Sequence, residues 1–575
     1  MNPYHKLLFT IFLIGFSVTL TMAQQPVYQW VKSVGGNSHD VGIDIIADDM
    51  GNTYVLGAVR GTVDMDPGAG TFMVTTDTTR GKLFLSKFDA SGNFLWTGLW
   101  DKGLYNNAYS LDFFPNGDIA ITGYYDFQVD MDPGPGVFML NAGGSLKYFL
   151  LRLSPAGNFV WVKEFAGVYN TPLCYSQIDS TGNCYIAGFF SNTYDFDPGP
   201  GTFSMTAVSR DIFIMKLDNS GNFMWAKKTT GTINNWVNDV ALSPLNEMII
   251  IGSFSGTTDF DPGPATFSIT AGTTISGEDF YVAKYSSSGI FMWVDHFDAN
   301  SVFSRPVGVE TDSNGRIYVA GQSSVNTDLD PDTASTYMPS TTRFLLKLNP
   351  DGSLNDVTEL GNKMYISNLE IDSWQHVYLT GSYVDTLDAD PGAGVYNLVT
   401  DSAGFGSFIL ALDSASNMIW ADGLGGHAHL GAQQNSGTSI YADAQGTVYF
   451  TGRYEDHQLD FGPYQLQNAT PWTYYYTDGY FGKIESITSG INEHDVSENS
   501  LTIYPNPTTD DINLKSNKRI LRMMITDVSG KTIASTVVND NVLKQHDISG
   551  FRQGMYFMQI FYDDGTSSAG KFIKN

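Results

Sequence analysis

The chain has 575 residues, which is too long for one ordinary hydrophobic core, so we expect at least two domains. Apolar residues make up 42% of the sequence and charged residues only 16%, yet the net charge at pH 7 is −29. This acidic balance argues against nucleic-acid binding, because contacts to phosphate groups need a basic surface.

Residues 1–23 have the pattern of a secretory signal peptide. Lys6 provides a positive charge, residues 7–20 form an apolar segment, and Ala23 ends a run suited to cleavage before Gln24. No later run reaches 18 consecutive apolar residues. We therefore predict an exported chain with no transmembrane segment after cleavage.

A unit of about 65 residues then recurs seven times between residues 24 and 487. Each unit has a glycine after an apolar run, and six have a tryptophan in a later apolar segment. The glycines are Gly57, Gly123, Gly188, Gly252, Gly321, Gly381 and Gly452. The tryptophans are Trp30, Trp96, Trp161, Trp225, Trp293 and Trp420, and Asn355 takes this place in one unit. Repetition at such a period indicates a repeat architecture.

The unit at 106–165 shows how the repeat is expected to fold. Its apolar pattern predicts strands at 109–113, 119–125, 149–153 and 159–163, with tight turns inside the first and last pairs. Tandem units of four antiparallel strands are typical of β-propeller blades. The last unit has only three such segments, whereas residues 27–32 form an isolated one. We therefore predict an all-β fold, with a seven-bladed β-propeller over residues 24–487 that is closed by the N-terminal strand.

Two motifs carry a family resemblance for these repeats. An Asp-x-x-Gly-x-x-Tyr-apolar-x-Gly pattern occurs at 179–188, 312–321 and 443–452, and Phe-x-x-Lys-Leu-Asp-x-x-Gly-Asn-Phe-x-Trp occurs at 213–225. The repeats resemble the bacterial seven-bladed propeller repeats called SBBP. This resemblance implies the propeller architecture and no particular reaction.

Two further features of the repeats lead to structural predictions. Cys174 and Cys184 lie on an expected hairpin in which Cys184 opposes residue 178. The offset of four residues from Cys174 corresponds to about 13 Å, too far for a disulfide, so we predict two free thiols. A basic residue also recurs in the third strand, and we interpret it as a salt-bridge partner or as a side chain that extends its charged end to solvent. These residues are Lys87, Arg152, Lys216, Lys284, Lys347 and Lys483, with Ala411 in the remaining unit.

An Asp-x-Asp-Pro-Gly motif follows the second strand of most units and is the first candidate site. Its acidic residues are Asp64 and Asp66, Asp130 and Asp132, Asp195 and Asp197, Asp259 and Asp261, Asp328 and Asp330, and Asp388 and Asp390, and in the unit of Asp328 the glycine is replaced by Asp332. Paired carboxylates suit Ca²⁺, which takes oxygen ligands. The interpretation we favour is a Pro-Gly turn in which the aspartates accept hydrogen bonds from their own backbone. We keep both interpretations, and expect these loops to lie on one face of the propeller.

The second candidate site is an aromatic run in the last unit. Trp472, Tyr474, Tyr475 and Tyr476 can stack on a sugar or a protein, or pack against one another. His427 and His429 lie in a glycine-rich segment that we interpret as a loop. The sequence contains no His-Glu-x-x-His or Gly-x-Ser-x-Gly motif and no complete phosphate-binding Gly-x-x-x-x-Gly-Lys-Ser/Thr motif.

A polar linker is expected at 488–500, followed by a small β-sandwich at 501–575. Its short strands are predicted at 501–504, 512–514, 522–527, 531–535, 554–562 and 570–573. Four motifs mark this module, and their residues are Pro505, Asn506 and Pro507, then Asp527, Gly530 and Lys531, then Gly554 and Tyr556, then Lys571 and Lys574. They resemble the C-terminal sorting domain of the type IX secretion system of Bacteroidetes. The resemblance implies the secretion machinery as a partner, and release or attachment at the cell surface. The alternative is an ordinary carbohydrate-binding or immunoglobulin-like sandwich.

The sequence therefore favours a secreted or cell-surface propeller that acts as a binding, adhesion or scaffold protein. Its ligand would be an extracellular glycan or protein. The alternative is a secreted hydrolase or lyase that acts on polysaccharide, because propellers also carry enzymes and a fold does not define a function. The repeated motif favours the first interpretation, since an enzyme gathers unlike polar residues at one point.

Overall fold

The computed structural model describes residues 26–485 and 502–574, except for short internal segments. These segments are 78, 102–106, 169–173, 273–277, 299–303, 332–337, 339, 401–403, 425–434, 457, 469–475, 505–507, 510, 528–531 and 563–566. The chain divides into two compact units, one spanning Ala23–Ile487 and the other containing Thr488–Asn575. The described residues form strands and turns without a helix, so none of them makes a helix that could cross a membrane.

Seven four-stranded antiparallel sheets make up the described part of the larger unit. Sheet 1 consists of β2 (Val41–Ala47), β3 (Thr53–Val59), β6 (Lys82–Phe88) and β7 (Phe94–Asp101). Sheet 2 consists of β8 (Asn107–Phe113), β9 (Ile119–Tyr125), β12 (Leu146–Leu153) and β13 (Phe159–Val168). Sheet 3 consists of β14 (Cys174–Ile178), β15 (Cys184–Phe190), β18 (Asp211–Leu217) and β19 (Phe223–Lys228). Sheet 4 consists of β21 (Asp239–Leu242), β22 (Met248–Phe254), β25 (Asp279–Tyr285) and β26 (Phe291–Phe297).

The last three sheets follow the same order from the first to the fourth strand. Sheet 5 consists of β27 (Arg305–Thr311), β28 (Ile317–Ser323), β29 (Thr342–Leu348) and β30 (Leu354–Gly361). Sheet 6 consists of β31 (Met364–Ile371), β32 (Val377–Val384), β35 (Phe405–Leu412) and β36 (Met418–Leu424). Sheet 7 consists of β37 (Ser436–Ala442), β38 (Val448–Tyr454), β41 (Asp478–Glu485) and β1 (Val27–Val34).

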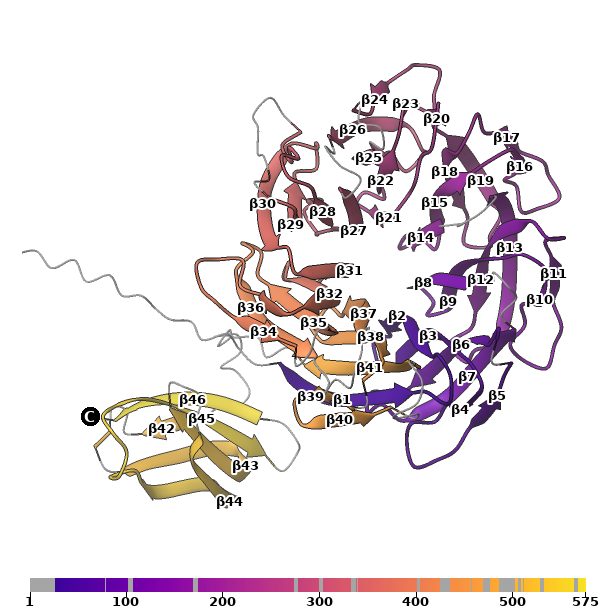
Figure 1. Ribbon diagram of the computed structural model, residues 1–575. Coiled ribbons are helices and arrows are strands. Elements are labelled where there is room, and N and C mark those ends of the chain that lie inside the picture. Colours follow the sequence, from indigo (N-terminus) through magenta and orange to yellow (C-terminus); the bar gives the residue numbers. More distant parts are fainter. Residues whose placement is uncertain are drawn as a thin grey trace, which may run out of the picture. The chain divides into compact units, whose positions relative to one another are not determined.

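The sheets follow one another around a ring, as in a propeller (Figure 1). The first strand of each sheet lies at the centre and contacts the first strand of the next sheet, and β37 also contacts β2. Strand β1 pairs with β41 from Val27 opposite Glu485 to Val34 opposite Gly479. The first and last strands of this unit therefore share one sheet, which leaves no unpaired edge at β41.

The connection between the second and third strands folds into a small two-stranded hairpin in every sheet except sheet 5, where part of the loop is outside the described residues. The hairpins are β4–β5 (Thr62–Asp64, Met73–Thr75), β10–β11 (Gln128–Asp130, Met139–Asn141), β16–β17 (Thr193–Asp195, Ser204–Thr206), β23–β24 (Thr257–Asp259, Ser268–Thr270), β33–β34 (Thr386–Asp388, Asn397–Val399) and β39–β40 (Gln458–Phe461, Tyr464–Gln467). A short strand, β20 (Thr230–Gly231), pairs with β23. Several hairpins lie at the outer side of the ring (Figure 1). The sequence predicted only a long connection here, because three-residue strands leave no periodic signal.

The recurring tryptophans join neighbouring sheets. The ring of Trp30 lies against Gly92, which is in a turn of the next sheet and has a φ of 77°. The Nε1 of Trp30 donates to the carbonyl of Ala90 in the same turn at 3.1 Å. Trp96 lies against Gly157 in the same way. A glycine is needed here both for its positive φ and because a Cβ would press on the indole ring. Each contact therefore closes a seam between two sheets.

We expect Gly157→Ala to destabilise the ring more than Gly143→Ala. Both glycines have a positive φ, of 80° and 63°. A Cβ on Gly157 would lie 3.0 Å from the Trp96 ring, whereas one on Gly143 would meet nothing within 4 Å. The control should lose about 1–2 kcal/mol from backbone strain alone, and Gly157→Ala about 1–3 kcal/mol more from overpacking. Thermal unfolding of both variants measures the difference, and equal losses would show that the indole gives way freely.

Five of the six recurring basic residues of the third strands form ion pairs, as the sequence predicted, and the Nζ of Lys483 lies over the ring of Tyr449. The Nε of Arg152 lies 2.8 Å from Oδ2 of Asp118 in its own sheet, and its Nη1 donates to the carbonyl of Asn219 in the next sheet at 2.6 Å. Lys284 likewise pairs with Glu247 at 2.6 Å and donates to the carbonyl of Pro350 at 3.0 Å. These largely buried cations therefore connect the turns of adjacent sheets.

The two cysteines are free and buried, which confirms the prediction. Cys184 pairs with Ile178 across the hairpin, and Cys174 pairs with Gly188. The expected register is therefore correct, and it separates the two thiols along the strands.

The smaller unit forms a five-stranded antiparallel sheet. Its strands are β42 (Thr502–Tyr504), β43 (Asp511–Asp527), β44 (Thr532–Asp547), β45 (Gly554–Tyr562) and β46 (Ser567–Lys574). The two strands predicted at 512–514 and 522–527 are one 17-residue strand, so that prediction was wrong. The polar run between them continues in β43, where the pairing with β44 shifts register between Lys515 and Ile520. The sandwich arrangement stays a prediction.

Candidate functional site

The Asp-Pro-Gly loops use their carboxylates to hold their own backbone. Oδ1 of Asp64 accepts the N–H of Asp66 at 3.1 Å and that of Phe72 at 2.7 Å. Oδ1 of Asp66 accepts the N–H of Gly68 at 2.8 Å. The same three bonds recur at the pairs Asp130 and Asp132, Asp195 and Asp197, Asp259 and Asp261, and Asp388 and Asp390. This geometry is the one that the turn interpretation requires.

The second carboxylate of each pair also lies against a glycine further along the loop. A Cβ on Gly70 would stand 2.1 Å from Oδ2 of Asp66, and the same holds for Gly136 against Asp132. In sheet 4 an alanine, Ala265, takes this position. The loop is thus folded around its own aspartate, a contact that the spacing of the residues did not reveal.

In sheet 5 the described residues show one bond of this set, from the N–H of Asp330 to Oδ1 of Asp328 at 3.1 Å. The rest of that loop lies outside the described residues. Calcium binding at these loops stays a prediction.

Most of the aromatic candidate site lies outside the described residues, which include neither Trp472, Tyr474 nor Tyr475. Tyr476 is described and is half-buried. Its ring packs edge-on against His39, with ring centres 5.1 Å apart. Tyr476 is therefore held near the first strand of sheet 1, and binding by the aromatic run stays a prediction. The loop with His427 and His429 also lies outside the described residues.

The structure brings together a set of carboxyl groups that sequence reasoning missed. They come from the first strands of five different sheets, around the centre of the ring (Figure 1). The residues are Asp44, Asp112, Asp239, Glu310 and Glu370, and each is half-buried. We call this set the central carboxylates. These residues are far apart in the sequence and lie among apolar residues, so no sequence motif predicts that they come together.

Several central carboxylates accept a hydrogen bond from the next sheet. Oδ2 of Asp44 accepts the N–H of Leu111 at 2.6 Å, and Oδ2 of Asp112 accepts that of Ile178 at 2.7 Å. Oδ2 of Asp239 accepts the N–H of Val309 at 3.0 Å. Between sheets 6 and 7 the amide oxygen of Asn368 accepts the N–H of Ile440 at 3.0 Å. In sheet 6 a neutral amide therefore accepts the hydrogen bond that a carboxylate accepts in sheets 1, 2 and 4.

The setting of the central carboxylates raises their pKa values. Burial raises the pKa of Asp44 to about 6 and that of Asp112 and Asp239 to about 7. Burial, and then repulsion from Asp239, raises the pKa of Glu310 to about 8. The pKa of Glu370 is raised by burial and by the charges of Glu310 and Asp44.

Other titratable groups share this region. Tyr175 lies near Asp239, and Tyr441 lies near Glu370, and burial raises the pKa of both hydroxyls first. Burial, and then the charge of Asp112, raises the pKa of the Cys184 thiol. None of these groups is positively charged near neutral pH, so ionisation of the carboxyl groups accumulates negative charge at the centre of the ring.

We expect the free energy of unfolding to fall as the pH rises from about 5 to about 8. A carboxyl group with a raised pKa keeps its proton in the folded state at a pH where the unfolded chain has lost it. The folded state then binds more protons than the unfolded state, so its stability decreases with pH. Thermal unfolding at pH 5, 6.5 and 8, at constant ionic strength with a chelator present, measures this slope.

Glu310→Gln tests the origin of the slope, because an amide cannot ionise. The variant should match the wild type at pH 5 and unfold at a higher temperature at pH 8. Asp49→Asn, which changes an exposed carboxylate, is the matched control and should leave the slope unchanged. An unchanged slope in Glu310→Gln would contradict a role for the central carboxylates.

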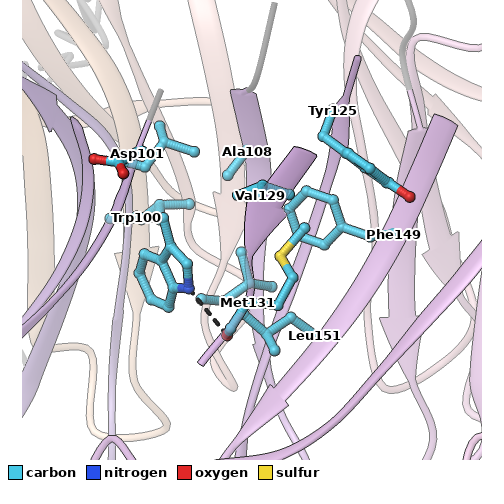
Figure 2. Close-up of a pocket in the computed structure, with 11 residues that line it drawn as sticks. Trp100, Asp101, Ala108, Tyr125, Val129, Met131, Phe149 and Leu151 are labelled. Carbon is cyan, nitrogen blue, oxygen red and sulfur yellow. Dashed lines mark hydrogen bonds between the residues drawn. The ribbon is translucent and has the colours of Figure 1, made fainter. Parts of the chain in front are cut away.

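A small cavity of about 20 Å³ lies between sheets 1 and 2 (Figure 2). Its walls include Ala108, Val129, Phe149 and Leu151, and the Nε1 of Trp100 donates to the carbonyl of Met131 at 3.1 Å beside it. A stable water molecule needs two to four polar partners, which these apolar walls do not offer. The cavity is therefore a packing space rather than a ligand site.

In the smaller unit the described part of the sorting motifs meets around β45 and β46. Gly554 pairs with Lys574, and Tyr556 with Phe572, whose rings are stacked 5.5 Å apart. Lys571 pairs with Phe557. Asp527, at the end of β43, pairs with Tyr556. The remaining motif residues, Pro505, Asn506, Pro507, Gly530 and Lys531, lie outside the described residues.

Comparison with known families identifies this smaller unit. Residues 502–575 match the model of the secretion system C-terminal sorting domain. The expected type IX sorting domain is thereby confirmed. It marks the chain for secretion by the type IX machinery and for the outer cell surface.

Likenesses of the ring are weaker. A stretch of 151 residues is 25% identical to an uncharacterized WD repeat-containing protein of Acanthamoeba polyphaga mimivirus. This match covers 24% of the chain and 11% of that relative, so the chain spans far less than two thirds of the relative's length.

Similar solved structures include an inactive virginiamycin B lyase of Staphylococcus aureus bound to quinupristin. It is 9% identical, with 79% of this chain and 99% of that chain covered and a TM-score of 0.35. PorZ of Porphyromonas gingivalis, a surface component of its type IX secretion system, is 9% identical over 95% of this chain and 100% of that chain, with a TM-score of 0.17. An apocarotenoid oxygenase variant of Synechocystis is 10% identical over 80% and 97%, with a TM-score of 0.35.

Proposed function

We propose that the exported ring is a seven-bladed β-propeller, closed by β1, that acts as a binding, adhesion or scaffold protein at the bacterial surface. The single observation that carries this proposal is the sorting domain at residues 502–575, which gives the ring an extracellular place of action. The pairing of β1 with β41, together with seven sheets of equal size, supports the blade count.

The repetition within the ring supports a binding role over catalysis. Five Asp-Pro-Gly loops carry the same set of backbone hydrogen bonds, so their aspartates are engaged in turns of one kind. A hydrolase or lyase needs an acid and a base with different surroundings at one point of the surface. Repeated equal loops instead suit a surface that presents the same feature several times, and several weak contacts together give strong attachment.

We place the specific ligand contact at the aromatic run of the seventh blade. Trp472 and its neighbours depart most from the repeat, and large flat side chains are the groups that stack on sugars and anchor protein interfaces. The test is co-sedimentation of the mature chain with insoluble cellulose, chitin and xylan, and with vesicles that contain lipopolysaccharide. Replacing residues 470–477 by a Gly-Ser loop should remove binding to whichever probe retains the wild type.

Replacing the turn at 142–145 in the second blade is the matched control and should leave this binding unchanged. Retention by the 470–477 variant would refute the location of the contact. Turnover of a soluble polysaccharide by the wild type would instead favour the enzyme alternative.

Calcium at the Asp-Pro-Gly loops is a separate part of the proposal. Oxygen ligands outside the cell make Ca²⁺ the natural candidate, although the Oδ1 atoms already accept backbone N–H groups. Titration of the chelator-treated mature chain with Ca²⁺, followed by calorimetry and thermal unfolding, tests whether these loops bind the ion. Saturable heat and a raised melting temperature support a metal role for these loops, whereas no heat and no shift assign them to turns alone.

A further inference from the structure

Three side chains that can ligate a metal ion lie close together at one corner of sheet 4, whereas the equivalent corners of sheets 1, 2 and 3 each contain a lysine and a carboxylate. They are Asp279 at the start of β25, His296 near the end of β26, and Asp298 just after that strand. One ligand atom from each lies within 4.8 Å of the other two. The Nε2 of His296 stands 3.1 Å from Oδ1 of Asp298 and 4.0 Å from Oδ2 of Asp279.

The strand registers show which residues take these places in sheet 3. Asp211 is the equivalent of Asp279, because each pairs with the last residue of the second strand, Phe190 or Phe254. Lys228 is the equivalent of His296, because each lies opposite the same position of the third strand, Phe213 or Tyr281. In sheet 3 the Nζ of Lys228 is 3.0 Å from Oδ2 of Asp211. It also donates to Oγ1 of Thr230, at the position of Asp298, at 3.0 Å.

Sheets 1 and 2 use the same positions for lysine ion pairs. In sheet 1 the Nζ of Lys82 lies 2.8 Å from Oδ1 of Asp101, and in sheet 2 Lys147 pairs with Glu164. Each of these three corners thus contains one ammonium group and one carboxylate. Sheet 4 instead has two carboxylates and an imidazole, three groups of the kinds that can each ligate a metal ion.

The local packing holds this corner ready for a cation. Asp279 is fully buried, and its Oδ2 accepts the N–H of Gly272 at 2.9 Å. The ring of His296 packs edge-on against Phe254, with ring centres 6.3 Å apart. The side chains of His296 and Asp298 are 34% and 66% exposed, so an ion can approach from solvent while the buried carboxylate fixes one side.

We propose that Asp279, His296 and Asp298 bind a divalent transition-metal ion of the Zn²⁺ type, at the place where sheet 3 holds the ammonium group of Lys228. One imidazole and two carboxylates are common ligands of Zn²⁺ and leave a fourth position open. Ca²⁺ prefers oxygen ligands alone, which separates this corner from the Asp-Pro-Gly loops. Ligands bonded at about 2.0–2.1 Å around Zn²⁺ stand roughly 3.4 Å apart. The distance from His296 to Asp298, 3.1 Å, is near this value, whereas Asp279, at 4.0 Å from His296, would have to move closer to bind the same ion.

A bound ion at this corner would fasten the outer strand of sheet 4, because β25 and β26 would share it. The inference does not depend on the ligand proposed for the seventh blade. It concerns an ion that the exported chain takes up from its surroundings.

The test is calorimetric titration of the chelator-treated mature chain with Zn²⁺, with Co²⁺ absorption as a second readout of the ligand set. The wild type should show saturable binding and a raised melting temperature. His296→Lys recreates the arrangement of sheet 3 and should remain folded while its affinity for Zn²⁺ falls at least tenfold. Asp298→Asn should also weaken binding.

Asp101→Asn changes the equivalent position of sheet 1 and is the matched control, with unchanged Zn²⁺ affinity expected. Absence of saturable Zn²⁺ binding by the wild type would overturn the proposal. Equal affinities of the wild type and His296→Lys would do the same, because the ion would then be bound elsewhere on the chain.

Discussion

Deleting residues 27–34 is expected to unfold sheet 7 and to destabilise the whole ring. Strand β1 supplies the fourth strand of that sheet, and Tyr28, Trp30 and Val31 are almost fully buried. The loss of one buried tryptophan alone costs about 3–5 kcal/mol, while a domain is stable by only about 5–15 kcal/mol. The deletion also removes the hydrogen bond from the Tyr28 hydroxyl to Oδ2 of Asp422, at 2.6 Å, and leaves a largely buried carboxylate behind.

Hydrogen exchange of the full chain, followed by mass spectrometry, measures this effect locally. Peptides from β41 and β38 should exchange much faster in the deletion variant, and its melting temperature should fall. Trp30→Ala should produce part of the same change. Gln29→Ala is the matched control, since Gln29 lies between the buried residues on the same strand but is exposed. Wild-type exchange in β41 after the deletion would show that β1 does not hold the ring closed.

Removing residues 488–575 is expected to abolish display at the cell surface while the ring still folds. The sorting domain lies wholly within this segment, which belongs to a compact unit distinct from the ring. The truncated chain should fail to cross the outer membrane and accumulate on its inner side, and surface labelling by an antibody should fall at least tenfold. Its melting temperature should remain close to that of the ring in the full chain.

A point variant distinguishes recognition of the folded sorting domain from recognition of a short linear tail. Phe572 is fully buried in β46, so Phe572→Ala should destabilise the domain by about 3–5 kcal/mol and lower surface display. Phe557 lies on the neighbouring strand and is 38% exposed, so Phe557→Ala should leave display unchanged. Full display of the Phe572→Ala variant, despite a measured loss of stability, would favour recognition of the linear tail.

Much of the ring could be read from the repeat, because strand period, turn residues and buried aromatics recur in one phase. The register that keeps Cys174 and Cys184 apart followed from counting residues around a turn, and the structure agrees. The short hairpins escaped prediction since three-residue strands such as β10 are too brief to show a period. The long strand β43 was divided in two because its polar middle resembles a loop.

The candidate sites were harder to predict from the sequence than the fold, for a different reason. The Asp-Pro-Gly motif was visible, but only the structure shows its carboxylates bonded to their own backbone. No motif in the sequence indicated the central carboxylates or the corner formed by Asp279, His296 and Asp298. Their members are brought together by the order of sheets around the ring or by strand pairing, rather than by proximity along the chain.

The all-β repeat, the acidic character of the ring and the sorting domain could be derived from the amino-acid sequence, because periodicity, composition and local motifs are properties of the order of residues. Which charged groups meet depends on the tertiary structure. The pKa of a carboxyl group and the ligand set of an ion depend on burial and on neighbours from other strands. The Lys228 corner of sheet 3 and the His296 corner of sheet 4 occupy the same place in the repeat. They differ in chemistry because of what the fold assembles around them.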